Sequence, residues 1–136
     1  MVKLLLAGTG LIGHRHMQHI LEHPDLELVG VIDPLITDEK IKGVKTYHSL
    51  NDVNKVAEGI ILATPTDTHA DLTIQSLEMG MHVLVEKPVA ASLLEADKMI
   101  SASEKTGLSI LVGHHRRHHP LVSETINILK SGKIGR

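Results

Sequence analysis

Short apolar runs alternate along this chain with segments whose apolar residues recur at helical spacing. The pattern predicts strands at residues 2–7, 28–32, 44–47, 60–63, 82–86 and 108–112, and helices after the first, fourth, fifth and sixth of them. Nearly continuous apolar runs are typical of parallel strands that are covered on both faces. The alternation therefore predicts an α/β fold, a doubly wound parallel sheet of about six strands with right-handed crossovers and helices on both faces.

The segments on either side of the third strand are less regular. Residues 37–42 are mostly polar, and we expect a short helix or a loop there. Farther along, Ser49 or Asn51 is suited to cap a short helix that continues through Val56. The length of residues 1–136 is that of one ordinary domain, so a single domain is expected.

Capping signals mark two of the later helices. Thr66 is expected to cap a helix that ends before Gly80. Ser92 and Glu95 have the S-x-x-E spacing of a capping box, and their helix is expected to end at Gly107.

A glycine motif lies between the first strand and the first helix. Residues 4–13 read LLLAGTGLIG and contain the spacing G-x-G-x-x-G. In a dinucleotide-binding (Rossmann) fold, Gly8 would make the tight turn, Gly10 would admit a pyrophosphate, and Gly13 would let the helix approach the sheet. The amide groups at the helix N-terminus would then face the phosphates. The predicted cofactor-binding loop consists of Gly8, Thr9, Gly10, Leu11, Ile12 and Gly13.

An acidic residue follows the second strand at the position such a site requires. Asp33 lies about 20 residues beyond the last glycine of the motif. A carboxylate there accepts hydrogen bonds from the ribose hydroxyls of NAD and repels the 2′-phosphate of NADP, so NAD is the expected cofactor and NADP is less favoured. The alternative is a simple glycine turn beside a solvated aspartate. The order of strand, turn, helix, strand and acid favours the nucleotide site.

Further polar segments follow later strands. Thr64 and Pro65 come after the fourth strand, Glu86 and Lys87 after the fifth, and residues 114–120 after the sixth. Ligands of open parallel sheets bind beyond the carboxyl ends of the strands. These segments are therefore expected to lie beside the glycine loop.

Four strings together resemble the glucose-fructose oxidoreductase and inositol dehydrogenase-like family of NAD(P)-dependent oxidoreductases. They are AGTGLIG at 7–13, ATPTDTHADL at 63–72, GMHVLVEKPVA at 80–90 and VGHHRRHHP at 112–120. Their order and spacing match the family as well, and the likeness covers essentially the whole chain. The combination of the second and third strings is much more specific than the glycines alone.

This resemblance implies roles for individual residues. Lys87 resembles the active-site lysine, which lies at the cofactor and hydrogen-bonds the reacting oxygen of the substrate. Glu86 resembles the acid that contacts the nicotinamide ribose, and the Lys87–Pro88 peptide bond is expected to be cis. The further implied cofactor contacts are Thr64, Pro65, His69 and Arg117.

The chemistry expected of Lys87 also has independent support. When hydride leaves or joins a carbinol carbon, charge develops on the attached oxygen, and an ammonium group within hydrogen-bonding distance stabilises that charge or relays its proton. The alternative is an exposed surface lysine paired with Glu86. A position directly after a strand favours the catalytic role.

The resemblance also implies a missing part. Family members continue past the G-x-I-G-R string, here residues 132–136, into a second domain with substrate contacts and an Asp-x-x-x-His pair. No residue of this chain is assigned those roles. The complete enzyme is expected to act on a sugar, a polyol or a related hydroxy or carbonyl compound, and this chain alone to bind cofactor without efficient turnover. The alternative is a noncatalytic dinucleotide-binding module for redox sensing or docking.

Composition narrows the choice of partners. The formal net charge of -2 gives no basic surplus for nucleic acid, and no apolar stretch approaches the roughly 20 residues of a membrane span. The absence of cysteine and of a charged leader fits the cytoplasm. Surfaces that a second domain would cover are expected to promote a homo-oligomer.

The 11 histidines invite a metal-binding interpretation. His16, His19 and His23 share a helical stripe, and residues 114–119 read HHRRHH. The arginines of the second group oppose a divalent cation, and neither group has an evident carboxylate or cysteine ligand. We therefore expect no metal site.

Overall fold

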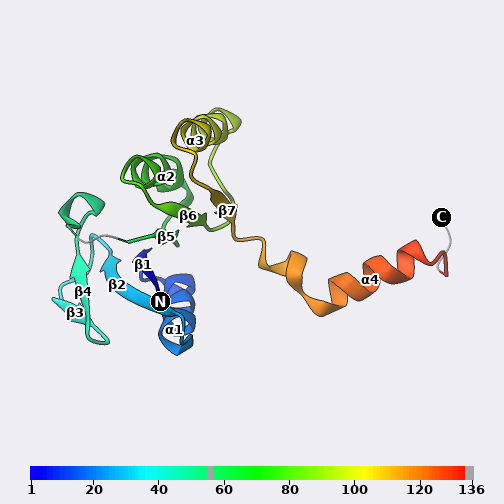
Figure 1. The fold of residues 1–136 in the computed structure, drawn as a ribbon, viewed down its shortest axis with the longest axis horizontal. Coiled ribbons are helices and arrows are strands. Elements are labelled where there is room, and N and C mark those ends of the chain that lie inside the picture. The colour runs from blue at the N-terminus through cyan, green and yellow to red at the C-terminus, as the bar shows by residue number, and fades with distance from the viewer. Residues whose placement is uncertain (55–56, 134–136) are drawn as a thin grey trace.

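The computed structural model describes residues 1–54 and 57–133, and its strands and helices alternate as expected (Figure 1). The strands are β1 (Val2–Ala7), β2 (Leu26–Ile32), β3 (Lys40–Ile41), β4 (Val44–Tyr47), β5 (Gly59–Leu62), β6 (His82–Val85) and β7 (Ile110–Val112). The α-helices are α1 (Leu11–Glu22), α2 (His69–Glu78), α3 (Leu93–Thr106) and α4 (Pro120–Lys130), and the 3₁₀ helices are η1 (Leu50–Asp52), η2 (Thr66–Thr68) and η3 (His115–His118).

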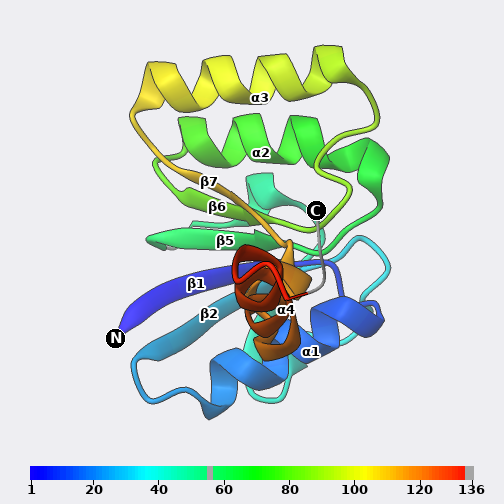
Figure 2. The ribbon, with the colours of Figure 1, turned by 90° about the vertical axis from the view of Figure 1, so that its right-hand side faces the viewer.

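The strands form one twisted sheet in the order β3-β4-β2-β1-β5-β6-β7. All pairs are parallel except β3 with β4. Strand order reverses at β1, whose neighbours are β2 on one side and β5 on the other, as Figure 2 shows. In such sheets the crevice at the reversal point is where ligands bind. The predicted fold class is confirmed.

A helix or loop was expected at residues 37–42; residues 37–39 are irregular, as the loop alternative expected, but residues 40–41 form the edge strand β3. Lys40 and Ile41 pair with β4 through a hairpin whose two connecting residues, Lys42 and Gly43, both have positive φ, 48° and 83°. This geometry is that of the tight turn that best matches the twist of a two-stranded ribbon. The sequence signal was weak because lysine, unlike asparagine or aspartate, rarely occupies the first of these positions.

The sheet is covered on both faces, and side chains of β1 alternate between two cores. Leu6 packs with Met17 and Ile20 of α1 on one face, whereas Leu5 belongs to the larger core under α2 and α3 on the other. Tyr47 is the only aromatic residue of the chain and belongs to this larger core; a Cβ on Gly30 would lie 2.8 Å from its ring. The remaining core side chains are aliphatic or Met.

Local capping differs from the sequence pattern in three places. Ser49 caps only the short η1, and the rest of the helix expected through Val56 lies partly outside the described residues. Thr66 begins η2 rather than capping α2. Ser92 accepts a hydrogen bond from the Glu95 amide as expected, but the Glu95 side chain accepts from the Ala91 amide, one residue before the cap.

The last helix extends away from the sheet, as Figure 1 shows in orange and red. A helix after the sixth predicted strand was expected, and none of the residues of α4 is buried. Its exposed apolar side chains are Leu121, Val122, Ile126, Ile128 and Leu129.

Helix α1 approaches the sheet across a stack of backbone atoms. Gly8 has φ 93°, and a Cβ on it would lie 2.3 Å from the carbonyl oxygen of Ala63. A Cβ on Gly13 would lie 2.0 Å from the carbonyl oxygen of Gly8. A Cβ on Gly10, in contrast, would meet no atom within 4 Å. The first and third glycines of the motif are therefore required by packing, and the second one leaves space open.

We expect Gly13→Ala to lower the free energy of unfolding by about 2–3 kcal/mol, because the added methyl group overlaps backbone that cannot rotate away. Gly10→Ala is the matched control and should change it by less than about 1 kcal/mol, the scale of a helix-cap substitution. Urea unfolding followed by circular dichroism measures both. Equal losses for the two variants would contradict the packing roles assigned to these glycines.

Candidate nucleotide site

The glycine loop and the start of α1 form an anion-binding corner. Gly10 is the N-cap of α1, none of the described side chains caps this end, and its first turn holds no acidic residue. Free amide groups and the positive end of the helix dipole thus face the open space over Gly10. This corner therefore has the positive potential, the hydrogen-bond donors and the space that a diphosphate group requires.

Asp33 is fixed beside the same loop. Its Oδ2 accepts hydrogen bonds from the amide and the hydroxyl of Thr9, at 2.9 and 2.6 Å, and its Oδ1 accepts one from the Leu35 amide at 3.0 Å. Partial burial raises the pKa of the Asp33 carboxyl, but the hydrogen bonds from Thr9 and Leu35 outweigh burial and lower the pKa below its ordinary value. The ionised form is therefore favoured at the end of β2.

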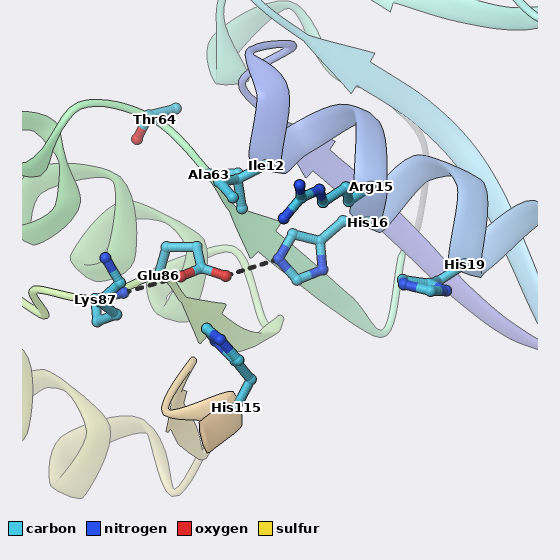
Figure 3. A pocket seen from close by; sticks show the side chains of 9 residues that line it. All are labelled: Ile12, Arg15, His16, His19, Ala63, Thr64, Glu86, Lys87 and His115. Carbon is cyan, nitrogen blue, oxygen red and sulfur yellow. Dashed lines mark hydrogen bonds and ion pairs between the residues drawn. The ribbon is translucent and has the colours of Figure 1, made fainter. Parts of the chain in front are cut away.

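A cleft of about 430 Å³ opens beside the glycine loop. Figure 3 shows its side chains converging from α1, from the ends of β5 and β6, and from the segment after β7. Its polar lining is mostly basic, with Glu86 as the one acidic residue of the lining. The lining residues are Ile12, Arg15, His16, His19, Ala63, Thr64, Glu86, Lys87 and His115.

Glu86 is held at the centre of this cleft by three elements. Its Oε1 accepts a hydrogen bond from Nε2 of His16 at 2.9 Å, and its Oε2 accepts one from the Lys87 amide at 3.2 Å (Figure 3). A Cβ on Gly113, after β7, would lie 3.1 Å from the carboxylate. The carboxylate therefore rests over a glycine, with its orientation set by His16.

Two loops border the cleft: the β5 loop, residues 63–68, and the β6 loop, residues 86–92. In the β5 loop, the hydroxyl of Thr68 lies 2.7 Å from both the Thr64 hydroxyl and the Pro65 carbonyl oxygen. In the β6 loop, the Lys87–Pro88 peptide bond is cis, as predicted. Each loop thus presents a polar side chain, Thr64 or Lys87, to the cleft.

The predicted site residues fall into two groups. The glycine loop, Asp33, Thr64, Glu86 and Lys87 gather around the start of α1. Pro65 lies at the border, whereas His69 and Arg117 are outside the cleft lining: His69 is buried behind the β5 loop and Arg117 is exposed in η3. Their cofactor contacts stay predictions.

The sequence pattern did not assign His16 or Gly113 to this site, whereas His115 belongs to residues 114–120, which were expected beside the glycine loop. His16 belongs to the histidine stripe of α1, and about one helical turn after Gly13 its side chain reaches Glu86 at the end of β6. The position of Gly113 directly after a strand was the available signal for that glycine. Within residues 1–54 and 57–133, no cluster of three His, Asp or Glu side chains could hold a metal ion. No described helix is long and apolar enough to cross a membrane.

The chain belongs to the oxidoreductase family with an NAD-binding Rossmann fold, whose model matches residues 2–114. It is 30% identical over 140 residues to 4-carboxy-2-hydroxymuconate-6-semialdehyde dehydrogenase of Sphingobium sp. (strain NBRC 103272 / SYK-6), covering 98% of this chain and 44% of that protein. It is 29% identical to scyllo-inositol 2-dehydrogenase (NAD(+)) of Bacillus subtilis (strain 168), covering 99% of this chain and 42% of the relative. The predicted family is confirmed.

Solved structures of dehydrogenases have the same fold as this chain. The WlbA dehydrogenase from Bordetella pertussis, in complex with NADH and UDP-GlcNAcA, matches with a TM-score of 0.90 and 28% identity, covering 99% of this chain and 41% of that one. Myo-inositol 2-dehydrogenase from Lactobacillus plantarum has the same fold, with a TM-score of 0.90. This chain spans less than half the length of each of these relatives.

The lowered pKa of Asp33 makes its stabilising effect depend on pH. An aspartate in the unfolded chain has a pKa of about 3.9, so the stabilisation is complete above that pH and is lost as the pH falls through the lower folded pKa. We expect Asp33→Asn to be less stable than the unchanged chain at about pH 6, and the difference to shrink below about pH 4. Urea unfolding at a series of pH values measures this difference.

Thr9→Val is the companion variant, because it removes the hydroxyl donor and keeps the amide donor. The stability of Thr9→Val should exceed that of Asp33→Asn by less than the stability of the unchanged chain does, and this smaller difference should also shrink as the pH falls. A difference between the unchanged chain and Asp33→Asn that stays constant over this range would contradict the role of these hydrogen bonds.

Proposed function

We propose that this chain is the NAD-binding domain of an oxidoreductase that transfers hydride between the nicotinamide and a sugar, polyol or related hydroxy or carbonyl compound. The observation that carries the proposal is the open space over Gly10 at the uncapped start of α1, directly beside a cleft that contains Lys87 and Glu86. The diphosphate and the nicotinamide of one cofactor would then occupy adjoining parts of this site. We propose the cytoplasm as the location of the protein.

The residues present fit a dinucleotide. The amide groups of Leu11, Ile12 and Gly13 would receive the diphosphate, and the Asp33 carboxylate would accept from the adenosine ribose hydroxyls. Asp33 keeps its charge through the hydrogen bonds that lower its pKa, so it would oppose a 2′-phosphate. NAD is therefore proposed over NADP.

Lys87 is the proposed catalytic residue. A bound nicotinamide would supply the hydride acceptor or donor. The Lys87 ammonium would hydrogen-bond the substrate oxygen as charge develops there, and in the reducing direction it would give that oxygen a proton; in the oxidising direction the neutral amine of Lys87 would take the hydroxyl proton. Glu86, with His16 behind it, would accept from the nicotinamide ribose and hold that ring beside the lysine. These roles favour an oxidoreductase over a noncatalytic sensor.

The proposed substrate class rests on two supports. The relatives include inositol and sugar dehydrogenases by name, and the cleft lining includes the cationic donor Lys87. The chain spans less than half of those proteins, so we propose that it binds cofactor and turns over little substrate when it is alone.

Fluorescence titration tests the cofactor proposal. NADH should bind more tightly than NADPH, and Asp33→Ser should narrow or remove that preference because the repelling carboxylate is gone. A polyol oxidation assay on the same samples should give little or no turnover. Failure to bind either nucleotide would refute the proposed function, and an unchanged preference in Asp33→Ser would refute the role of that residue.

We also propose that the chain forms a homo-oligomer, because α4 exposes an apolar surface that a soluble monomer would rarely leave uncovered. Light scattering over a range of concentrations should show association. The double variant Leu121→Glu with Leu129→Glu should abolish it, and Leu35→Glu, at an exposed position outside α4, should not. A wild-type chain that is monomeric throughout would contradict this proposal.

A further inference from the structure

The ring of His69 connects two separate loops. His69 is the first residue of α2 and is only 1% exposed. Its Nδ1 lies 2.9 Å from the carbonyl oxygen of Pro88, and its Nε2 lies 3.0 Å from the carbonyl oxygen of Thr64. One buried side chain thus contacts the backbone of both the β5 loop and the β6 loop.

Val89 and Ala90 of the β6 loop pack against the larger core, and hydrogen bonds add a direct connection between the two loops. The β5–β6 ladder reaches as far as the bond from the Glu86 amide to the Leu62 carbonyl oxygen, at 2.9 Å. Past that point, within the part of the chain that the structure describes, His69 is the only side chain that hydrogen-bonds to both loops. Among these hydrogen bonds, the ring of His69 therefore sets the spacing beyond the strand ends.

The spacing matters because each bonded carbonyl adjoins a side chain of the cleft. The Thr64 carbonyl belongs to a residue that lines the cleft, and Pro88 directly follows Lys87. A shift of either loop would change the distance between Thr64 and the lysine. The ring itself is outside the cleft lining, so it acts on the site through the backbone.

The chemistry of the contacts restricts the state of the ring. A carbonyl oxygen only accepts, so both contacts are hydrogen bonds only when both ring nitrogens carry a proton. A doubly protonated ring is the state in which His69 holds both loops.

We propose that His69 is a positioning residue, which donates from both nitrogens and sets the spacing of the two loops at the nicotinamide end of the site. This inference rests on the proposed function, since it concerns the same cofactor. It predicts that loss of one donor weakens binding of the nicotinamide half and leaves binding of the adenosine diphosphate half unchanged. The adenosine diphosphate half would bind at the glycine loop and Asp33, which do not hydrogen-bond to His69.

The test uses two matched variants of the chain. The amide of His69→Asn can replace the Nδ1 donor to Pro88, and the amide of His69→Gln can replace the Nε2 donor to Thr64. Each variant keeps the hydrogen bond to one loop and loses the hydrogen bond to the other. We expect both to weaken NADH binding about three- to tenfold, the effect of one lost hydrogen bond, and to change ADP binding less than about twofold.

The controls separate this effect from a general loss of structure. His82→Gln, at the opposite end of β6, should leave the affinity for both nucleotides unchanged. Thermal unfolding is measured for every variant. Equal weakening of NADH and ADP by the His69 variants, or no weakening of either, would overturn the inference. A wild-type chain that binds neither nucleotide would instead refute the proposed function.

A spectroscopic measurement on the unchanged chain makes the test independent of any variant. In a nitrogen-15 spectrum of the histidine rings, His69 should show two N–H groups, both protected from exchange with water. His82 is the internal reference, because its Nδ1 accepts a hydrogen bond from the Ser109 amide and so carries no proton. A His69 ring with one bare nitrogen would overturn the link between the loops.

Discussion

The close approach of α1 to the sheet is the constraint on which the site depends. Gly13 lies against the Gly8 carbonyl and Gly8 against the Ala63 carbonyl, with no side chain between them. One turn farther along the same helix, His16 reaches Glu86 at the end of β6. A larger separation would move the helix dipole away from the open corner and break this hydrogen bond. One backbone stack therefore positions both the anion corner and the cleft.

The two acidic groups of the site are oriented by the protein itself. Asp33 accepts three hydrogen bonds from Thr9 and Leu35, and Glu86 accepts from His16 and from the Lys87 amide. Oxygens held in this way need little rearrangement when a ligand arrives, which is the main advantage of a preorganised polar site. The basic side chains around Glu86 are more exposed and line the open part of the cleft.

Much of this arrangement could be read from the sequence, because short-range rules govern it. Apolar runs gave six strands, and the glycine spacing with Asp33 gave one corner of the site. The hairpin at Lys42 was missed because its turn has lysine where asparagine or aspartate usually precedes the glycine. His16 and Gly113 were missed for a different reason: their roles arise from contacts with Glu86, distant in sequence, and no local pattern encodes such contacts.

The packing of Tyr47 over Gly30 has a consequence for optical measurements. The chain contains no tryptophan or phenylalanine, so this one ring provides its aromatic near-ultraviolet signal. Tyr47 is 5% exposed and lies in the larger core at β4, one strand from the edge of the sheet. Tyrosine absorbance and emission therefore report on one known place in the molecule, and they leave the longer wavelengths free of protein background.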